Sequence, residues 1–250
     1  TPQTASTVTP TPPSREELQA ELAPVPGLPP APQPPQSPSM DDILDVALRH
    51  MKGNRGGDLV VILMVGSGAR RTLTAHSDLD LVGLVKGAYE GGELLRVANR
   101  LVDIRYRDIP SVEEELDTSL RLPSLLRKAK VLFDVEDVAG QLLDKANQIF
   151  KQGPPPAKMN ERIQLKADCF HWIGKAEDLR DHPATAQYLL NQFLEDYILA
   201  FLRLRGFWLT APADTIRFIG SREPAIGDLL ERFMTSPSIG DRLAVGNQLA

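Results

Sequence analysis

The sequence predicts an α/β (α+β) domain with a small mixed sheet, followed by an antiparallel helical bundle. Three observations lead to this fold class. Short apolar runs bounded by turn residues recur up to about residue 150, which is typical of strands mixed with helices. Residues 152–156 (QGPPP) then interrupt regular structure. Beyond them the apolar residues recur with the period of a helix.

The chain begins with a proline-rich extension. Of the 21 prolines, 12 lie in the first 40 residues, where large apolar side chains are scarce. Such a segment buries too little surface to offset its ordering entropy, so we expect an extended, polyproline-like conformation. Residues 14–17 (SREE) have capping-box spacing and predict a short helix through Leu22.

We therefore expect three parts: an extension over residues 1–39, a mixed domain over 40–152 and a helical domain over 157–250. The mixed domain opens with a helix that Ser39 caps and Gly53 ends. Its apolar positions share one face: Ile43, Val46, Ala47 and Met51. Five strands are predicted, at residues 58–64, 78–86, 93–97, 101–107 and 129–134. The third and fourth are expected to form a hairpin with Asn99 in its turn.

Two long helices are predicted to begin the bundle. The first has an apolar stripe made by Ile163, Ala167, Phe170, Ile173, Ala176 and Leu179. The second begins at Pro183, ends at Gly206 and has an apolar stripe made by Leu190, Phe193, Tyr197, Ala200 and Leu204. Shorter helices are expected near residues 214–219, 224–234 and towards 249.

Composition narrows the class of protein. A net charge of -5, with 42% hydrophobic and 24% charged residues, indicates no general polyanion-binding surface. Cys169 is the only cysteine, which excludes an internal disulfide and favours a reducing compartment, so we expect a cytoplasmic location. The longest apolar run, residues 59–65, is too short to cross a bilayer.

Two acids stand within the predicted second strand. Alternate strand residues share a face, so Asp78 and Asp80 are expected on one side, with Cα atoms roughly 6.5 Å apart, while Leu79 and Leu81 point into the core. Carboxylates this close repel each other unless a cation lies between them. Hard oxygen ligands suit Mg²⁺ or Mn²⁺. The spacing alone also fits a solvated strand edge.

The upstream turn favours the metal interpretation. Gly66 and Ser67 follow a buried strand, which places backbone N–H groups and a hydroxyl where a phosphate can approach. Arg70 and Arg71 add positive charge just beyond. A phosphate-binding turn and a pair of metal-binding carboxylates on consecutive elements predict a site for a metal-bound triphosphate.

The pattern Gly66-Ser67, ten residues, then Asp78-Leu-Asp80 resembles the signature of polymerase β superfamily nucleotidyltransferases, in particular minimal nucleotidyltransferases and aminoglycoside nucleotidyltransferase relatives. In that family a third carboxylate comes from a later, neighbouring strand. Asp103, within LVDIRY, matches it. Asp108 is the competing candidate, but its place before Pro110 is ordinary for a turn residue.

The resemblance implies an enzyme that transfers a nucleoside monophosphate from a nucleoside triphosphate, with ATP the favoured donor, to a hydroxyl or amine. Asp78, Asp80 and Asp103 would hold two Mg²⁺ or Mn²⁺ ions, and Asp103 could also take the acceptor proton. Ser67 and the loop amides would orient the phosphates. Arg70, Arg71 or Arg105, which shares a strand face with Asp103, could offset the phosphate charge.

The helical half resembles the HEPN-type domains often fused to such nucleotidyltransferases, through its helix pattern and aromatic placement. Within that half, no arginine has the spacing to His171 or His182 that HEPN ribonucleases use. The alternative function is a nucleotide-binding regulatory or antitoxin-like module with little or no turnover. The sequence does not identify the acceptor, which could be a small molecule, a protein side chain or an RNA end. It also leaves open which base is preferred and whether the protein forms a homodimer.

Overall fold

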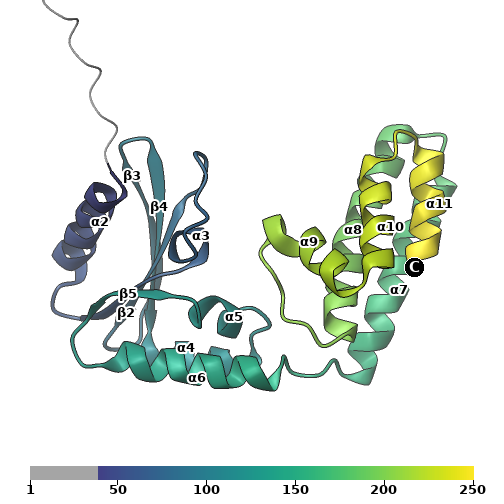
Figure 1. Ribbon diagram of the computed structural model, residues 1–250. Coiled ribbons are helices and arrows are strands. Elements are labelled where there is room, and N and C mark those ends of the chain that lie inside the picture. Colours follow the sequence, from purple (N-terminus) through teal and green to yellow (C-terminus); the bar gives the residue numbers. More distant parts are fainter. Residues whose placement is uncertain (1–38) are drawn as a thin grey trace, which may run out of the picture. The chain divides into compact units, whose positions relative to one another are not determined.

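The computed structural model describes residues 39–250, and it confirms the predicted fold class (Figure 1). A five-stranded mixed sheet in the order β3-β4-β2-β1-β5 is followed along the chain by helices alone. The short helix expected at residues 14–22 lies outside the described residues. Within residues 39–250, no helix has the length and apolarity that a membrane span requires.

The sheet contains one parallel pair, β2 with β4, and every other pairing is antiparallel. The strands are β1 (Leu59–Met64), β2 (Leu79–Val85), β3 (Glu90–Val97), β4 (Arg100–Asp108) and β5 (Lys130–Asp134). Asn99 lies in the turn between β3 and β4, as predicted, and Ala98 beside it adopts a left-handed φ of 53°.

Helices fill the remainder of the chain. Those of the first half are α2 (Met40–Arg55), α3 (Gly66–Ala69), α4 (Ile109–Thr118), α5 (Leu122–Leu126) and α6 (Val138–Gln152). Those of the second half are α7 (Met159–Asp178), α8 (Pro183–Leu204), α9 (Pro212–Arg222), α10 (Pro224–Thr235) and α11 (Ile239–Leu249). No regular element occupies residues 153–158, the segment rich in proline.

The predicted cap of α2 is confirmed, because the Ser39 hydroxyl accepts a hydrogen bond from the backbone N–H of Asp42 and the Asp42 carboxylate accepts one from the Ser39 N–H. This reciprocal pair satisfies two N–H groups that the first turn would leave free. The helix continues past Gly53 to Arg55, so the predicted end was two residues early. Val46, predicted on the apolar face, is 37% exposed.

The two faces of the sheet are covered by different helices. Buried side chains of α2 pack with Leu79, Leu81 and Ile104 on one face. On the other face α4, α5 and α6 pack with residues that include Leu63 and Leu84. Leu79 and Leu81 therefore point into the core as predicted, and the alternate residues of β2 face the side of α4, α5 and α6.

The cap of α4 is the residue that also ends β4. Ser111 and Glu114 have capping-box spacing in the sequence, but Asp108 is the N-cap residue, and its carboxylate accepts the Ser111 N–H at 2.9 Å. Proline at the second helical position follows it. Asp108 is thus the last residue of β4 and the N-cap of α4, and its carboxylate is used as a helix cap.

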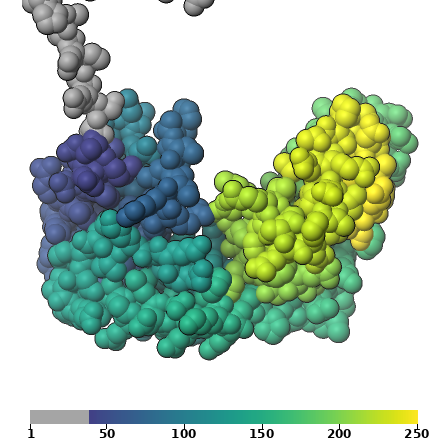
Figure 2. Space-filling model, in the orientation of Figure 1, coloured from purple at the N-terminus to yellow at the C-terminus, as the bar shows by residue number. Residues whose placement is uncertain are grey.

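The helices α7 to α11 share a separate buried cluster centred on Phe193, which is fully buried and packs its ring against those of Tyr197 and Phe233. Figure 2 shows the side chains of residues 183–250, coloured green to yellow, packed closely against one another. Pro183 opens α8 at its first position, and Gly206 follows the helix with φ +70°, both as predicted.

The stripe predicted for α7 is only partly buried. Ile173 and Ala176 lie in the core, but Ile163 and Phe170 are each 60% exposed. The helix is turned so that Leu165 and Cys169 pack inward instead. Met159 is 70% exposed near the same end, so an apolar strip on α7 remains at the surface.

Replacing Phe193 with Ala should remove about 3–5 kcal/mol from the free energy of unfolding, because a large cavity replaces a fully buried ring. Phe170→Ala is the matched control and should change it by no more than about 0.5 kcal/mol, since that ring faces solvent. Urea unfolding followed by circular dichroism measures both. Equal losses for the two variants would contradict the assigned burial.

Candidate active site

The site begins with the parallel pairing of β2 and β4. In its register Asp80 lies directly opposite Asp103. Directly paired residues of neighbouring strands project to the same face, with the strands about 4.8 Å apart. Their neighbours Leu79, Leu81 and Ile104 are fully buried on the opposite face. The two carboxylates therefore share the face that α4, α5 and α6 partly cover.

Asp78 was predicted inside the strand, but β2 begins at Leu79 and Asp78 is the exposed residue just before it. It still lies close enough to affect Asp80 electrostatically. Burial, and then repulsion by the carboxylates of Asp78 and Asp103, raise the pKa of the Asp80 carboxyl above its ordinary value. The three acids thus form one electrostatic group although only two are in strands.

The predicted phosphate loop touches this group. Gly66 has φ +63°, and a Cβ built there would lie 2.2 Å from the Asp80 Oδ2 atom. The left-handed backbone favours glycine, and a methyl group added there would have to displace the Asp80 carboxylate. The Val65 N–H donates to the Asp80 carbonyl at 3.0 Å, which ties the loop to β2. The helix α3 that follows is a single turn of four residues.

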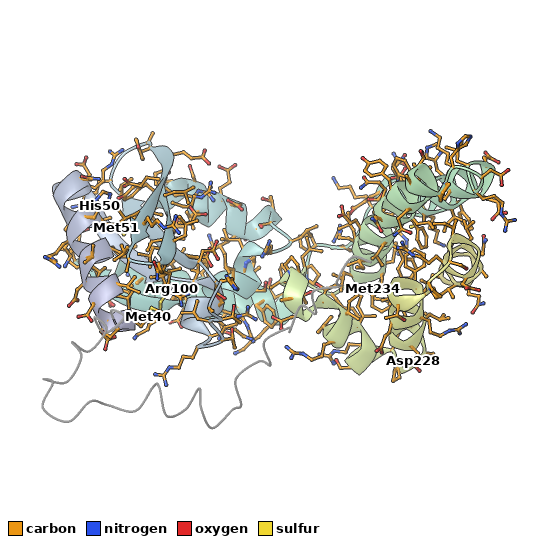
Figure 3. The ribbon with its side chains drawn as sticks, turned by 90° about the horizontal axis from the view of Figure 1, so that it is seen from above. Met40, His50, Met51, Arg100, Asp228 and Met234 are labelled. Atoms are coloured by element: carbon orange, nitrogen blue, oxygen red, sulfur yellow. The ribbon has the colours of Figure 1, made fainter. Side chains whose placement is uncertain are left out.

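Arg100, labelled in Figure 3, holds the loop that leads to Asp78. Its guanidinium donates hydrogen bonds to the carbonyl oxygens of Thr74 and Ser77, and the Thr74 N–H donates to the Ser77 hydroxyl at 2.9 Å. Arg100 is not among the site residues predicted from the sequence. Its place at the start of β4 becomes meaningful only when β2 and β4 are known to be neighbours.

Arg105 lies two residues beyond Asp103 on the same face of β4, as predicted. Its Nε and Nη2 atoms donate to the two oxygens of Asp103 at 3.0 and 3.2 Å. The hydrogen bond and charge of Asp103 raise the pKa of the Arg105 guanidinium. The side chain of Arg105 is 68% exposed, so this pair can open without unpacking the core.

Arg70 and Arg71, both predicted as phosphate ligands, have different surroundings. The Arg70 Nη1 atom donates to the Asp214 carboxylate of α9 at 2.5 Å, and its Nε donates to the Gly66 carbonyl at 3.2 Å. The hydrogen bond from Arg70 lowers the pKa of the Asp214 carboxyl. Arg71 is exposed, with a left-handed φ of 58°. In this arrangement Arg70 is held by a carboxylate.

Arg121 is a second residue that the sequence analysis missed. It is the exposed N-cap residue of α5, and its charge acts to lower the pKa of Asp80 against the larger effects that raise it. Nothing in the local sequence connects Arg121 with Asp80, since 41 positions separate them and the packing of α5 brings them together.

The donor set of the three aspartates fits a hard divalent cation, because carboxylate oxygens are the preferred ligands of Mg²⁺ and Mn²⁺. In the arrangement described for residues 39–250, however, no three His, Cys, Asp or Glu side chains converge as a metal site. Arg105 occupies both oxygens of Asp103. A cation would have to replace that guanidinium as the counter-charge.

Comparisons with known proteins found similarity only to solved structures. No protein-family model and no curated protein matches the sequence. Among solved structures, the crystal structure of a nucleotidyltransferase-like protein from Exiguobacterium sibiricum 255-15 is similar, with a TM-score of 0.47 and 14% sequence identity over 82% of this chain and 74% of that chain.

Gly66→Ala should destabilise the protein by at least about 1 kcal/mol more than Gly87→Ala. Both residues have positive φ, +63° and +77°, so both alanines carry the left-handed backbone strain. Only at Gly66 does the added methyl group meet a carboxylate, whereas Gly87 has nothing within 4 Å. Equal losses in urea unfolding would show that the Gly66 loop moves freely away from Asp80.

Asp80→Asn should raise the melting temperature of the metal-free protein at pH 7 by roughly 2 °C, since it removes a charge that burial and two neighbouring acids disfavour. A raised carboxyl pKa means that wild type loses stability as pH rises, so the difference should vanish below about pH 4. Asp228→Asn, an exposed position on α10, is the control and should have little effect. A lower melting temperature for Asp80→Asn at pH 7 would contradict the assigned repulsion.

Proposed function

We propose that the chain is a metal-dependent nucleotidyltransferase that moves a nucleoside monophosphate from a nucleoside triphosphate to a hydroxyl or amine. One observation carries this proposal: the parallel register sets Asp80 opposite Asp103, with Asp78 and the Gly66 turn beside them. Three acids held this close are retained where a cation can offset their repulsion. A purely structural strand edge gains nothing from such crowding.

In the proposed reaction the acceptor oxygen or nitrogen forms a bond to the α-phosphorus. The bond between that phosphorus and the bridging oxygen breaks, and pyrophosphate leaves with the electron pair. Asp103 accepts the proton of the acceptor. Asp78, Asp80 and Asp103 would hold Mg²⁺ or Mn²⁺, which supplies Lewis-acid stabilisation of the attacking and leaving oxygens.

The phosphate loop supports this proposal through its backbone. Gly66 allows a phosphate to approach without meeting a side chain, and Ser67 next to it is only partly buried. Arg105 then changes role, since a cation at Asp103 would release its guanidinium towards the phosphates. ATP is the expected donor, and the division into a nucleotide domain over residues 40–152 and a HEPN-like domain over 157–250 remains part of the proposal.

A second candidate function is supported by the Arg105 ion pair. Because both oxygens of Asp103 accept hydrogen bonds from Arg105, a protein that never loads a second cation would keep Asp103 neutralised. Such a protein would bind a nucleotide and turn it over slowly or not at all. This is the regulatory or antitoxin-like alternative, and a homodimer formed through the helices would fit it equally well.

Pyrophosphate release from ATP with Mg²⁺ or Mn²⁺, measured in the presence of cell extract as the source of acceptor, separates the two functions. Asp80→Asn and Asp103→Asn should each reduce release by at least about 100-fold. Asp108→Asn is the control and should retain activity, because Asn also caps a helix well.

Mass spectrometry of the same mixtures identifies the acceptor through the added nucleotide mass. Metal-dependent ATP binding without pyrophosphate release or labelled product would support the regulatory alternative. Loss of activity in Asp108→Asn but not in Asp103→Asn would exchange the roles of those two residues.

A further inference from the structure

A cavity of about 820 Å³ opens beside the phosphate loop. Gly66 and Arg70 line one end, and Phe150, Trp208 and Arg222 are among the other lining residues. Its size is that of a small-molecule site. The Trp208 indole N–H donates to the Phe150 carbonyl at 3.1 Å, and their rings stack 5.8 Å apart, so this part of the wall is well packed.

The lining of this cavity is strongly cationic, although the chain as a whole has a net charge of -5. Asp214 is the one acid in the lining, and it already accepts hydrogen bonds from Arg70 and Arg217. The basic residues of the lining are Arg70, Arg121, Arg127, Lys128, Arg217 and Arg222. Such an excess of positive charge selects an anionic ligand.

Arg127 is one of the cations that line the cavity. The central carbon of its guanidinium lies over the Phe150 ring, 3.8 Å from the centroid. Its Nε atom is buried and has no hydrogen-bond partner anywhere in residues 39–250. Because Nε is itself inaccessible, a ligand in the cavity would contact the remaining guanidinium N–H groups, whose fork geometry suits phosphate oxygens.

The position of the cavity relative to the carboxylates indicates which part of the donor nucleotide it would bind. Strand β2 carries Asp80 and lies between β4, which carries Asp103, and β1, which leads into Gly66. The cavity begins at Gly66, on the side of Asp80 away from Asp103. In an in-line displacement the attacking and leaving groups lie on opposite sides of the phosphorus. If Asp103 receives the acceptor proton, the cavity is on the side of the leaving group.

We propose that the cavity binds the polyphosphate end of the donor nucleotide, with Arg127, Lys128 and Arg222 as its binding residues. This inference rests on the proposed function and extends it, because it assigns residues outside the sheet to the donor. Arg121, which lies near Asp80, continues the line of positive charge from the carboxylates into the cavity. The acceptor then approaches from the opposite side, where exposed Leu94 pairs with Asp103 across β3 and β4.

Isothermal titration with sodium tripolyphosphate at low salt and without divalent metal tests the inference on the whole chain. Wild type should bind it saturably, and added NaCl should weaken binding because the contacts are ionic. Arg127→Gln should weaken binding by at least about tenfold. Since Arg127 also packs on Phe150, a second variant that combines Lys128→Gln with Arg222→Gln should give a similar loss. Arg162→Gln, at an exposed position on α7, is the control.

The outcomes separate this inference from the proposed function. Asp80→Asn should retain tripolyphosphate binding while losing pyrophosphate release. Equal binding by wild type, Arg127→Gln and the double variant would overturn the cavity assignment and leave the transferase proposal intact. Binding of AMP but not of tripolyphosphate would also overturn it, since the cavity would then suit an acceptor. Tripolyphosphate binding that needs Arg127, in a protein that releases no pyrophosphate, would preserve the polyphosphate site and reject the transferase.

Discussion

The register of one parallel strand pair is the constraint on which the rest of the site depends. Because Asp80 and Asp103 are direct partners, both carboxylates project to the same side of the sheet. A slip of one residue would turn Asp103 towards α2 and expose Val102 and Ile104, which are now fully buried. The hydrophobic packing on the α2 face therefore fixes the position of the charges on the other face.

Three neighbouring carboxylates repel one another, and arginines from different elements offset this repulsion. Arg105 neutralises Asp103 from within the same strand, Arg121 acts on Asp80 from the start of α5, and Arg100 holds the loop that carries Asp78. These residues place positive charge on three sides of the acids.

Local patterns in the sequence predicted much of this structure. The apolar runs predicted the strands and Ser39 predicted a cap, whereas only the resemblance to nucleotidyltransferases joined Asp103 to Asp80 in the predicted site. Periodicity failed on α7, where Ile163 and Phe170 proved exposed, because two neighbouring faces of that helix are both apolar and only the packing against α8 selects one. The partner of Arg70 was equally beyond prediction, since Asp214 is 144 positions away.

The bond between Arg70 and Asp214 has a thermodynamic consequence. It joins the residue next to the phosphate turn to α9, so any anion that draws Arg70 away leaves Asp214 to Arg217 alone. Coupling between two binding sites is reciprocal. If a ligand at the first site changes the affinity of the second site by some factor, a ligand at the second site changes the affinity of the first by the same factor. A molecule that recognises α9 with Asp214 released would therefore sense an anion bound by Arg70 without touching that anion.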